Sequence, residues 1–155
     1  MSELKREALS DLTAMESYGA RIAKRLREGD VVALSGGLGA GKPTLARAII
    51  AALGYPPEVP SPTFTIIETY DAPPLRLPVV HADFYRLEDP AEIHEIGLDD
   101  YREGAALIAE WPDHAGGFAH EAGCLSVALE RASETEDEGR IAIASGGADW
   151  LGRMP

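Results

Sequence analysis

A glycine-rich stretch at residues 36–42, with the sequence GGLGAGK, constrains the fold of this chain more than any other feature. It follows an apolar run at 31–35 and precedes residues 44–53, which have helical character. This order of strand, glycine-rich loop, lysine and helix is typical of a P-loop, in which backbone N–H groups, a helix N-terminus and the lysine bind phosphate. The residues expected to contact a nucleotide are Gly37, Leu38, Gly39, Ala40, Gly41, Lys42, Pro43 and Thr44.

The residue after the lysine departs from the usual P-loop pattern. The pattern requires Ser or Thr there to ligate Mg²⁺, but this chain has Pro43, and the next hydroxyl is that of Thr44. Proline is tolerated in the first turn of a helix. Consecutive helix residues point about 100° apart, so we expect the Thr44 hydroxyl to face the α-phosphate instead of the metal. The sequence predicts a folded P-loop with weak Mg²⁺ dependence and depressed hydrolysis.

Length, charge and cysteine content restrict the class of protein. The 155 residues predict a single P-loop ATPase domain, 1–155, with a loose C-terminal tail at about 146–155. A net charge of −12 argues against stand-alone nucleic-acid binding; it suits either docking on a basic protein or simple solubility. The single cysteine, Cys124, excludes an internal disulfide and predicts a buried thiol. The polar N-terminus and the lack of a long apolar run predict a cytoplasmic protein without membrane contact.

Hydrophobic patterns predict the remaining elements. Residues 9–12 are expected to form a short strand, followed by a helix with Asp11 or Thr13 as its N-cap. Further strands are predicted at 64–70, 77–83 and 105–110, a short helix at 90–96, and a terminal hairpin from 124–129 and 140–144. The pattern indicates an α/β fold: a P-loop NTPase-like, three-layer domain with a central, mostly parallel sheet.

Two of the predicted strands end in a carboxylate, at Asp83 and Glu110. Ligands bind at the carboxyl ends of strands in α/β sheets, and Mg²⁺ prefers oxygen ligands. Asp83 is therefore expected to hold Mg²⁺, and Glu110 to orient the attacking water or support the metal. Trp111 either packs on the nucleotide or fills the core, and His81 is expected to be a core residue. Residues 61–63 form either a switch-like loop or an ordinary proline-rich turn.

The order and spacing of four motifs resemble the TsaE (YjeE) family over residues 9–111. The motifs are 39–42 with Thr44, SPTFT at 61–65, H-x-D-x-YRL at 81–87, and EWP at 110–112. The resemblance implies a cytoplasmic ATPase that binds ATP or ADP with Mg²⁺. Such proteins act with TsaB and TsaD in forming threonylcarbamoyladenosine at position 37 of tRNA, and meet tRNA only through the complex.

Carried over to this chain, the resemblance implies that Lys42 binds phosphate and that Asp83 binds Mg²⁺. It also implies that Thr63 belongs to the switch-like loop and that Glu110 and Trp111 complete the nucleotide site. Two positions depart from the family: Gly37 replaces an acid, and Pro43 replaces a threonine. The second departure leaves open a nucleotide-sensing scaffold with little ATPase activity. A small-molecule kinase is disfavoured because the sequence has no arginine-rich lid.

Overall fold

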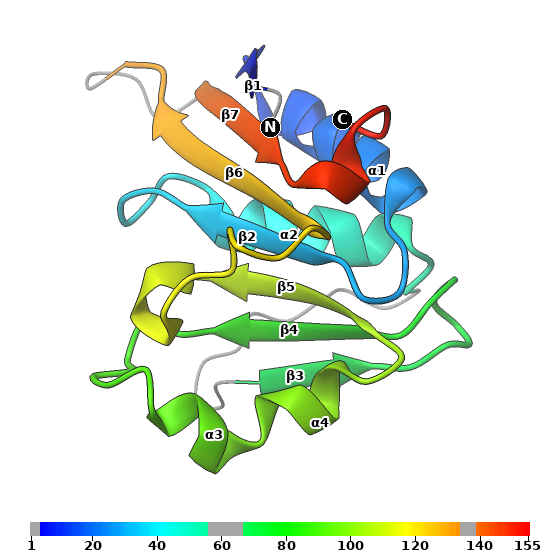
Figure 1. Cartoon of the computed structure of the whole chain (residues 1–155). Helices are drawn as coiled ribbons and strands as arrows, with labels where there is room; N and C mark the ends of the chain where they lie inside the picture. The colour runs from blue at the N-terminus through cyan, green and yellow to red at the C-terminus, as the bar shows by residue number, and fades with distance from the viewer. Residues whose placement is uncertain (1–3, 56–66, 134–138) are drawn as a thin grey trace.

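The structure, a computed structural model, describes residues 4–55, 67–133 and 139–155. Within these residues, seven strands form one sheet in the order β1-β7-β6-β2-β5-β4-β3 (Figure 1). The strands are β1 Leu4–Leu9, β2 Val31–Ser35, β3 Ile67–Tyr70, β4 Val79–Asp83, β5 Ala106–Glu110, β6 Cys124–Arg131 and β7 Arg140–Gly146. Strands β6, β2, β5 and β4 pair in parallel, whereas β1–β7, β7–β6 and β4–β3 pair antiparallel. The predicted mostly parallel sheet and terminal hairpin are both confirmed.

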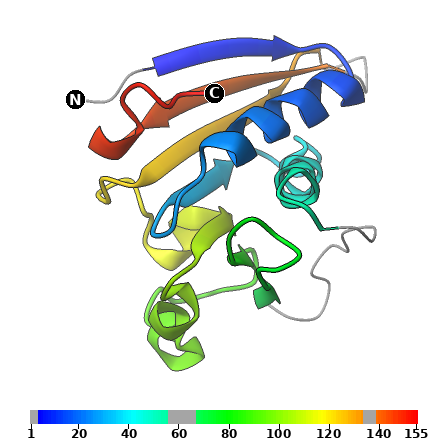
Figure 2. The same ribbon diagram turned by 90° about the vertical axis from the view of Figure 1, so that its right-hand side faces the viewer.

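Helices cover the two faces of the sheet. The two longer helices are α1 Leu12–Arg25 and α2 Lys42–Ala52, and the shorter ones are α3 Glu92–Ile96, α4 Leu98–Arg102 and the 3₁₀ helices η1 Pro112–Ala115 and η2 Ala148–Trp150. Figure 2 shows α1 and α2 on one side of the sheet. Helices α3 and α4 pack against the other side through Leu98, Ile93 and Ile96. This arrangement confirms the predicted three layers.

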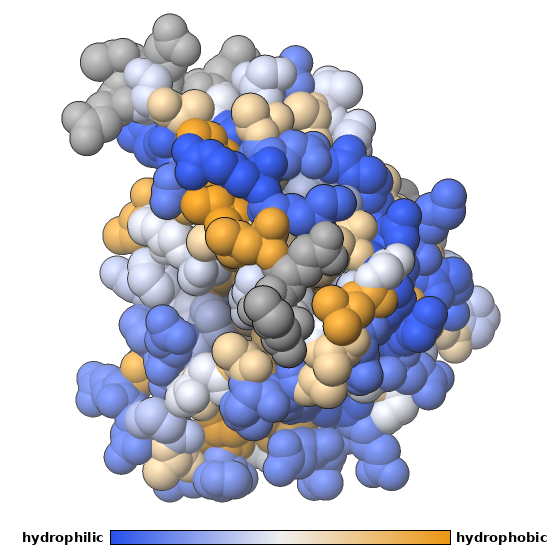
Figure 3. Space-filling model, turned by 45° about the horizontal axis from the view of Figure 1, so that its top comes forward, coloured by the Kyte–Doolittle hydropathy of each residue, from blue (hydrophilic) through white to orange (hydrophobic). Residues whose placement is uncertain are grey.

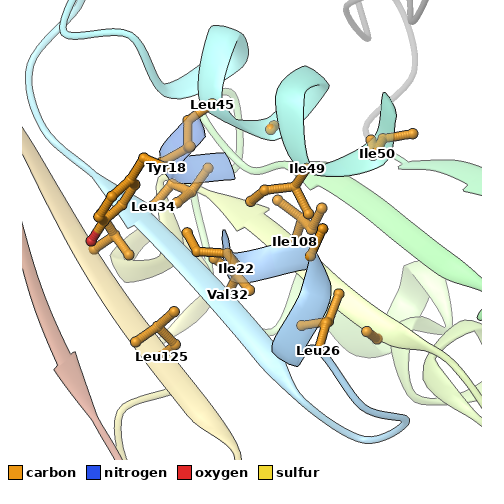
Figure 4. Close-up of a cluster of buried hydrophobic side chains, with 14 of the residues drawn as sticks. Tyr18, Ile22, Leu26, Val32, Leu34, Leu45, Ile49, Ile50, Ile108 and Leu125 are labelled. Atoms are coloured by element: carbon orange, nitrogen blue, oxygen red, sulfur yellow. The ribbon is translucent and has the colours of Figure 1, made fainter. Parts of the chain in front are cut away.

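The central strand β2 separates two hydrophobic cores because its side chains alternate between the faces. Val32 and Leu34 join the core under α1 and α2, while Val31 and Ala33 join the core on the opposite face. Helix α1 contributes the predicted apolar stripe, and Figure 4 shows Tyr18, Ile22 and Leu26 lying against α2 and the sheet. A Cβ added to Gly19 would lie 2.7 Å from Ala48 Cβ, so the two helices approach closely at this point.

The predicted N-terminal strand at 9–12 was wrong in position. Strand β1 instead spans Leu4–Leu9 and pairs antiparallel with β7, and the helix begins after Asp11, whose side chain accepts a hydrogen bond from Ala14 N at 2.8 Å. Most side chains of β1 are exposed because it is an edge strand. Its sequence, LKREAL, therefore lacks the hydrophobic alternation by which half-buried strands are recognised.

The prediction of a loose tail at 146–155 was also wrong. Trp150 is fully buried, and its Nε1 donates a hydrogen bond to Gly123 O at 2.8 Å. Arg153 donates to both carboxylate oxygens of Asp30, at 2.8 and 3.1 Å, and lies over the Trp150 ring. A Cβ at Gly146 would lie 2.5 Å from Trp150 Cβ, so glycine permits this close return of the chain. The packing depends on long-range contacts that leave no local sequence pattern.

The surface of the protein is largely polar on the face that Figure 3 shows, and hydrophobic side chains occur on it in small groups. Within the described ranges, no helix has the length and apolar character needed to cross a membrane. Cys124 is a buried free thiol, as predicted, and burial raises its pKa.

Candidate functional site

The glycine-rich loop leaves the end of β2 and turns into α2, as predicted. Gly36 has a φ of +136°, and a Cβ there would lie 2.4 Å from Leu129 O, so this position requires glycine. Gly41 precedes α2 with a φ of +107°, also in the region that favours glycine. The loop therefore has the strand–turn–helix context that a P-loop requires.

Lys42 is the first residue of α2, and its side chain folds back over the loop. The residue is 2% exposed, and Nζ donates hydrogen bonds to Gly36 O and Gly37 O, each at 2.8 Å. The ammonium group also lies 4.3 Å from the centre of the Trp111 ring, a cation–π distance. The predicted lysine and tryptophan are therefore in direct contact.

Trp111 reaches this position through an unusual backbone conformation. Its φ and ψ of 54° and 53° are left-handed, which is uncommon for a residue other than glycine. Its N–H donates to Leu34 O at 3.3 Å, and its ring packs against Tyr85 and His114. The strained turn directly after β5 thus directs the indole toward the P-loop lysine.

Strand register brings the two predicted carboxylates together. Asp83 at the end of β4 is paired with Glu110 at the end of β5, and Glu110 is also paired with Leu34 of β2. Alternation along the strands places both carboxylates on the face that α1 and α2 cover, because Val79 and Ile108 of the same strands lie in that core. Asp83, Glu110 and Lys42 thus converge where β2 enters the loop.

His81 lies within this group, although the sequence indicated only a core residue. It is completely buried on the same face as Asp83, and its Nε2 donates to Glu110 Oε2 at 2.6 Å. Its Nδ1 is a buried atom that has no hydrogen-bond partner among the described residues. The spacing of His81 and Asp83 showed that they share a face, but the diagonal contact with Glu110 depends on the pairing of β4 with β5.

Burial governs the titration of two groups in the site. It lowers the pKa of Lys42, while the charges of Glu110 and Asp83 act in the opposite direction. Burial also raises the pKa of Asp83; the Tyr85 N–H lowers it, and the Glu110 charge raises it further. The site therefore brings the ammonium group of Lys42 close to the carboxyl groups of Asp83 and Glu110 in a region partly shielded from water.

Pro43 and Thr44 are the two residues that follow Lys42 in α2. Pro43 is exposed in the first turn of α2, and the helix forms normally around it. Thr44 lines a cavity of about 180 Å³ next to the loop, together with Gly41, Met15 and Arg140. The structure thus agrees with the expectation that Thr44 does not take over the position of the missing hydroxyl.

The remaining predicted residues divide into two groups. Gly37 accepts from Lys42, while Leu38 is 72% exposed at the tip of the loop. Gly39 and Ala40 accept hydrogen bonds from Arg140 of β7, a residue that no motif in the sequence indicated. Thr63 and the rest of 61–63 lie outside the described residues.

The carboxylates of the site suit a Mg²⁺ ion that is bound partly through phosphate. Within the described residues, no group of three or more His, Cys, Asp and Glu side chains is arranged so that it could hold a metal ion, which argues against a metal held by protein ligands alone. Mg²⁺ instead needs one or two carboxylates together with substrate phosphates. The paired strand ends of Asp83 and Glu110 fit that requirement, although one Glu110 oxygen is occupied by His81.

The sheet, the loop and the two acidic strand ends define a P-loop α/β protein. The model of the family described as "Threonylcarbamoyl adenosine biosynthesis protein TsaE" matches residues 9–141. The chain therefore belongs to the TsaE family, as its motifs indicated. The match extends past Trp111, where the sequence resemblance ended, and includes β6 and the first residues of β7.

Individual relatives agree with this assignment. The chain is 39% identical over 145 residues to a tRNA threonylcarbamoyladenosine biosynthesis protein TsaE of Streptomyces coelicolor, covering 88% of this chain and 93% of that protein. It is 33% identical to the Haemophilus influenzae protein of the same name, covering 76% of this chain and 77% of that one. The crystal structure of YdiB from Bacillus subtilis superposes with a TM-score of 0.75 at 25% identity, covering 99% of this chain and 93% of that chain.

Proposed function

We propose that this protein is a nucleotide-binding subunit that binds ATP and ADP and acts with TsaB and TsaD in forming threonylcarbamoyladenosine at position 37 of tRNA. One observation carries the nucleotide part of the proposal: Lys42, Asp83 and Glu110 converge at the end of β2, where the P-loop begins. Family membership supports the tRNA-modification part. Because the protein is acidic, we expect it to contact tRNA through its partners and not directly. We expect this to take place in the cytoplasm.

In this proposal, Lys42 exchanges Gly36 O and Gly37 O for oxygens of the β- and γ-phosphates. The exchange is favourable because a lysine–phosphate contact joins opposite charges, whereas the present contacts join a charge to neutral carbonyls. Trp111 keeps the ammonium group at the mouth of the loop during this exchange. The cavity bordered by Thr44 and Arg140 lies next to the loop and is the place proposed for the remainder of the nucleotide.

Asp83 and Glu110 are the residues that would hold Mg²⁺, which would supply positive charge to the phosphates. Glu110 is also a candidate to orient a water molecule, because its bond to His81 fixes one carboxylate oxygen and its strand position is paired with that of Asp83. Hydrolysis is expected to be slow, since Pro43 supplies neither a hydroxyl nor an N–H where the P-loop pattern has both.

The exposed Pro43 also favours a second candidate, a nucleotide-sensing scaffold that binds ATP or ADP and scarcely hydrolyses it. The test is phosphate release from ATP by the isolated protein, by the protein with TsaB and TsaD, and by that mixture with substrate tRNA. Slow basal release that rises with the partners supports the ATPase. Tight binding with no release in any mixture supports the scaffold, and fast release that ignores the partners contradicts both.

A further inference from the structure

Arg140 connects the far side of the sheet to the P-loop. It is the first residue of β7, where it is paired with Leu9 of β1 and Arg131 of β6. Its Nε donates to Ala40 O at 3.0 Å, and its Nη2 donates to Gly39 O at 3.0 Å. The other guanidinium nitrogen, Nη1, donates to Gly139 O at 2.9 Å. One side chain therefore holds two consecutive carbonyls of the loop from a strand about 100 residues away in sequence.

The two bonds fix the orientation of two peptide groups. In a trans peptide the C=O and the following N–H point in opposite directions. Holding Gly39 O fixes the Ala40 N–H, which donates to Gly37 O at 3.2 Å and closes the turn of the loop. Holding Ala40 O turns the Gly41 N–H away from Arg140. This N–H belongs to the residue before the lysine, where P-loop amides converge on phosphate.

The hydrogen bonds of Arg140 hold one conformation of a loop that is otherwise rich in flexible glycine. Gly39 and Gly41 both have positive φ, and glycine backbones lose more conformational freedom on ordering than those of other residues. A loop of this kind binds phosphate well only if its shape is set in advance. The guanidinium fork matches two neighbouring carbonyls, whereas a lysine ammonium group acts as a point charge with no fixed geometry.

We propose that Arg140 is a positioning residue that holds the P-loop in its phosphate-binding shape. The inference rests on the proposed nucleotide site, but it concerns a residue outside the P-loop and carboxylate motifs. It differs from a direct contact between Arg140 and the nucleotide in the neighbouring cavity, which Arg140 also lines. The two roles are separable because pyrophosphate needs only the loop, whereas ADP would also occupy the cavity.

The experiment is calorimetric binding of ADP and of inorganic pyrophosphate to the full chain and its variants. Arg140→Gln should weaken the binding of both ligands by about tenfold or more, since two charge-assisted hydrogen bonds are lost. Arg140→Lys should fall between Arg140→Gln and the unchanged protein. Arg6→Gln on the neighbouring strand β1 removes the same charge from an exposed position and should leave both affinities unchanged. Hydrogen exchange of residues 36–42 should speed up in Arg140→Gln and should not change in Arg6→Gln.

The outcomes distinguish this inference from the function on which it rests. If the unchanged protein binds neither ligand, or Lys42→Ala binds both normally, the nucleotide site itself is wrong. If Lys42→Ala loses binding but Arg140→Gln retains pyrophosphate affinity, the positioning role is wrong, and a loss confined to ADP assigns Arg140 to the cavity. Should Arg140→Gln fail to fold, Arg140→Lys decides: affinities equal to those of the unchanged protein overturn the proposal.

Discussion

His81 Nε2 lies 2.6 Å from Glu110 Oε2, and both side chains are almost completely buried. This contact crosses from β4 to β5 and links the core of the sheet to the edge of the site. A carboxylate removed from water in this way requires its donor, because an unpaired buried charge is strongly destabilising. His81 therefore contributes both to folding and to the orientation of Glu110.

We expect His81→Leu to lower the free energy of unfolding by about 3–5 kcal/mol, because it leaves the Glu110 carboxylate buried without its donor. Urea denaturation measures this difference. The double variant His81→Leu/Glu110→Leu removes both polar groups and should recover most of the lost stability. Equal destabilisation in the single and double variants would mean that packing volume matters here and that the hydrogen bond does not.

Lys42→Ala should weaken ATP and ADP binding by about ten- to a hundredfold, because it removes the positive charge that faces the phosphates. Isothermal calorimetry measures both affinities. Lys24→Ala is a suitable control, since Lys24 is exposed on α1 and its removal changes the net charge equally. A Lys42→Ala protein with near-normal affinity would contradict the P-loop assignment.

Asp83 and Glu110 should have separable roles despite their adjacent positions. Asp83→Asn is expected to lose the tightening of nucleotide binding by Mg²⁺ while keeping metal-free affinity. Glu110→Gln retains an oxygen that accepts from His81, so it should bind Mg·ATP well and lower kcat with little change in KM. Titration of nucleotide with and without Mg²⁺, combined with steady-state kinetics, measures both effects. Identical binding losses in the two variants would indicate purely structural roles.

The stability of the metal-free protein should depend on the charge of Asp83. Burial raises the pKa of this carboxyl in the folded state, so its stabilising contribution is complete below its ordinary pKa and is lost as pH rises through the folded-state pKa. Asp83→Asn should therefore raise the melting temperature at neutral pH, and the gain should vanish below about pH 4. Asp71→Asn, which removes a carboxylate from an exposed position, is the matched control.

Pro43→Thr should restore Mg²⁺-dependent ATP hydrolysis, because it supplies the hydroxyl and N–H that the P-loop pattern places after the lysine. Its cost in unfolding free energy should be at most about 1 kcal/mol, since it removes only the restriction that proline imposes on the unfolded chain. Hydrolysis and Mg²⁺ affinity are measured with the partners present, and melting is measured separately. If the Pro43 protein already equals the variant in both activities, another residue supplies the metal ligand.

Much of this architecture was predictable because its parts have local signatures. The P-loop, the strand ends at Asp83 and Glu110, and the stripe of α1 each follow from short-range spacing. The errors came from segments whose structure depends on distant partners. Strand β1 is a polar edge strand that exists through its pairing with β7, and the C-terminal residues are ordered by Asp30 and the surroundings of Trp150.

The same distinction holds within the site. The motifs indicated Lys42, Asp83 and Glu110, whereas the roles of His81 and Arg140 emerge only from contacts made across the sheet. Arg140 in particular lies in a segment without a recognisable motif, yet its side chain reaches the loop that the motif defines. Sequence patterns therefore identified the groups proposed to bind the nucleotide better than those that hold them in place.

The buried thiol of Cys124 is a natural probe for the opening of the core around it. It is the single cysteine of the chain, and it is paired with Val31 at the start of the strand that leads into the P-loop. Its side chain is packed in the core that includes Leu98 and Phe118, so a thiol reagent can reach it only when that packing opens, and the labelling rate reports how often it does. A bound nucleotide that stabilises the folded state should slow the labelling in proportion to its occupancy. Binding could thus be followed without attaching any probe to the site itself.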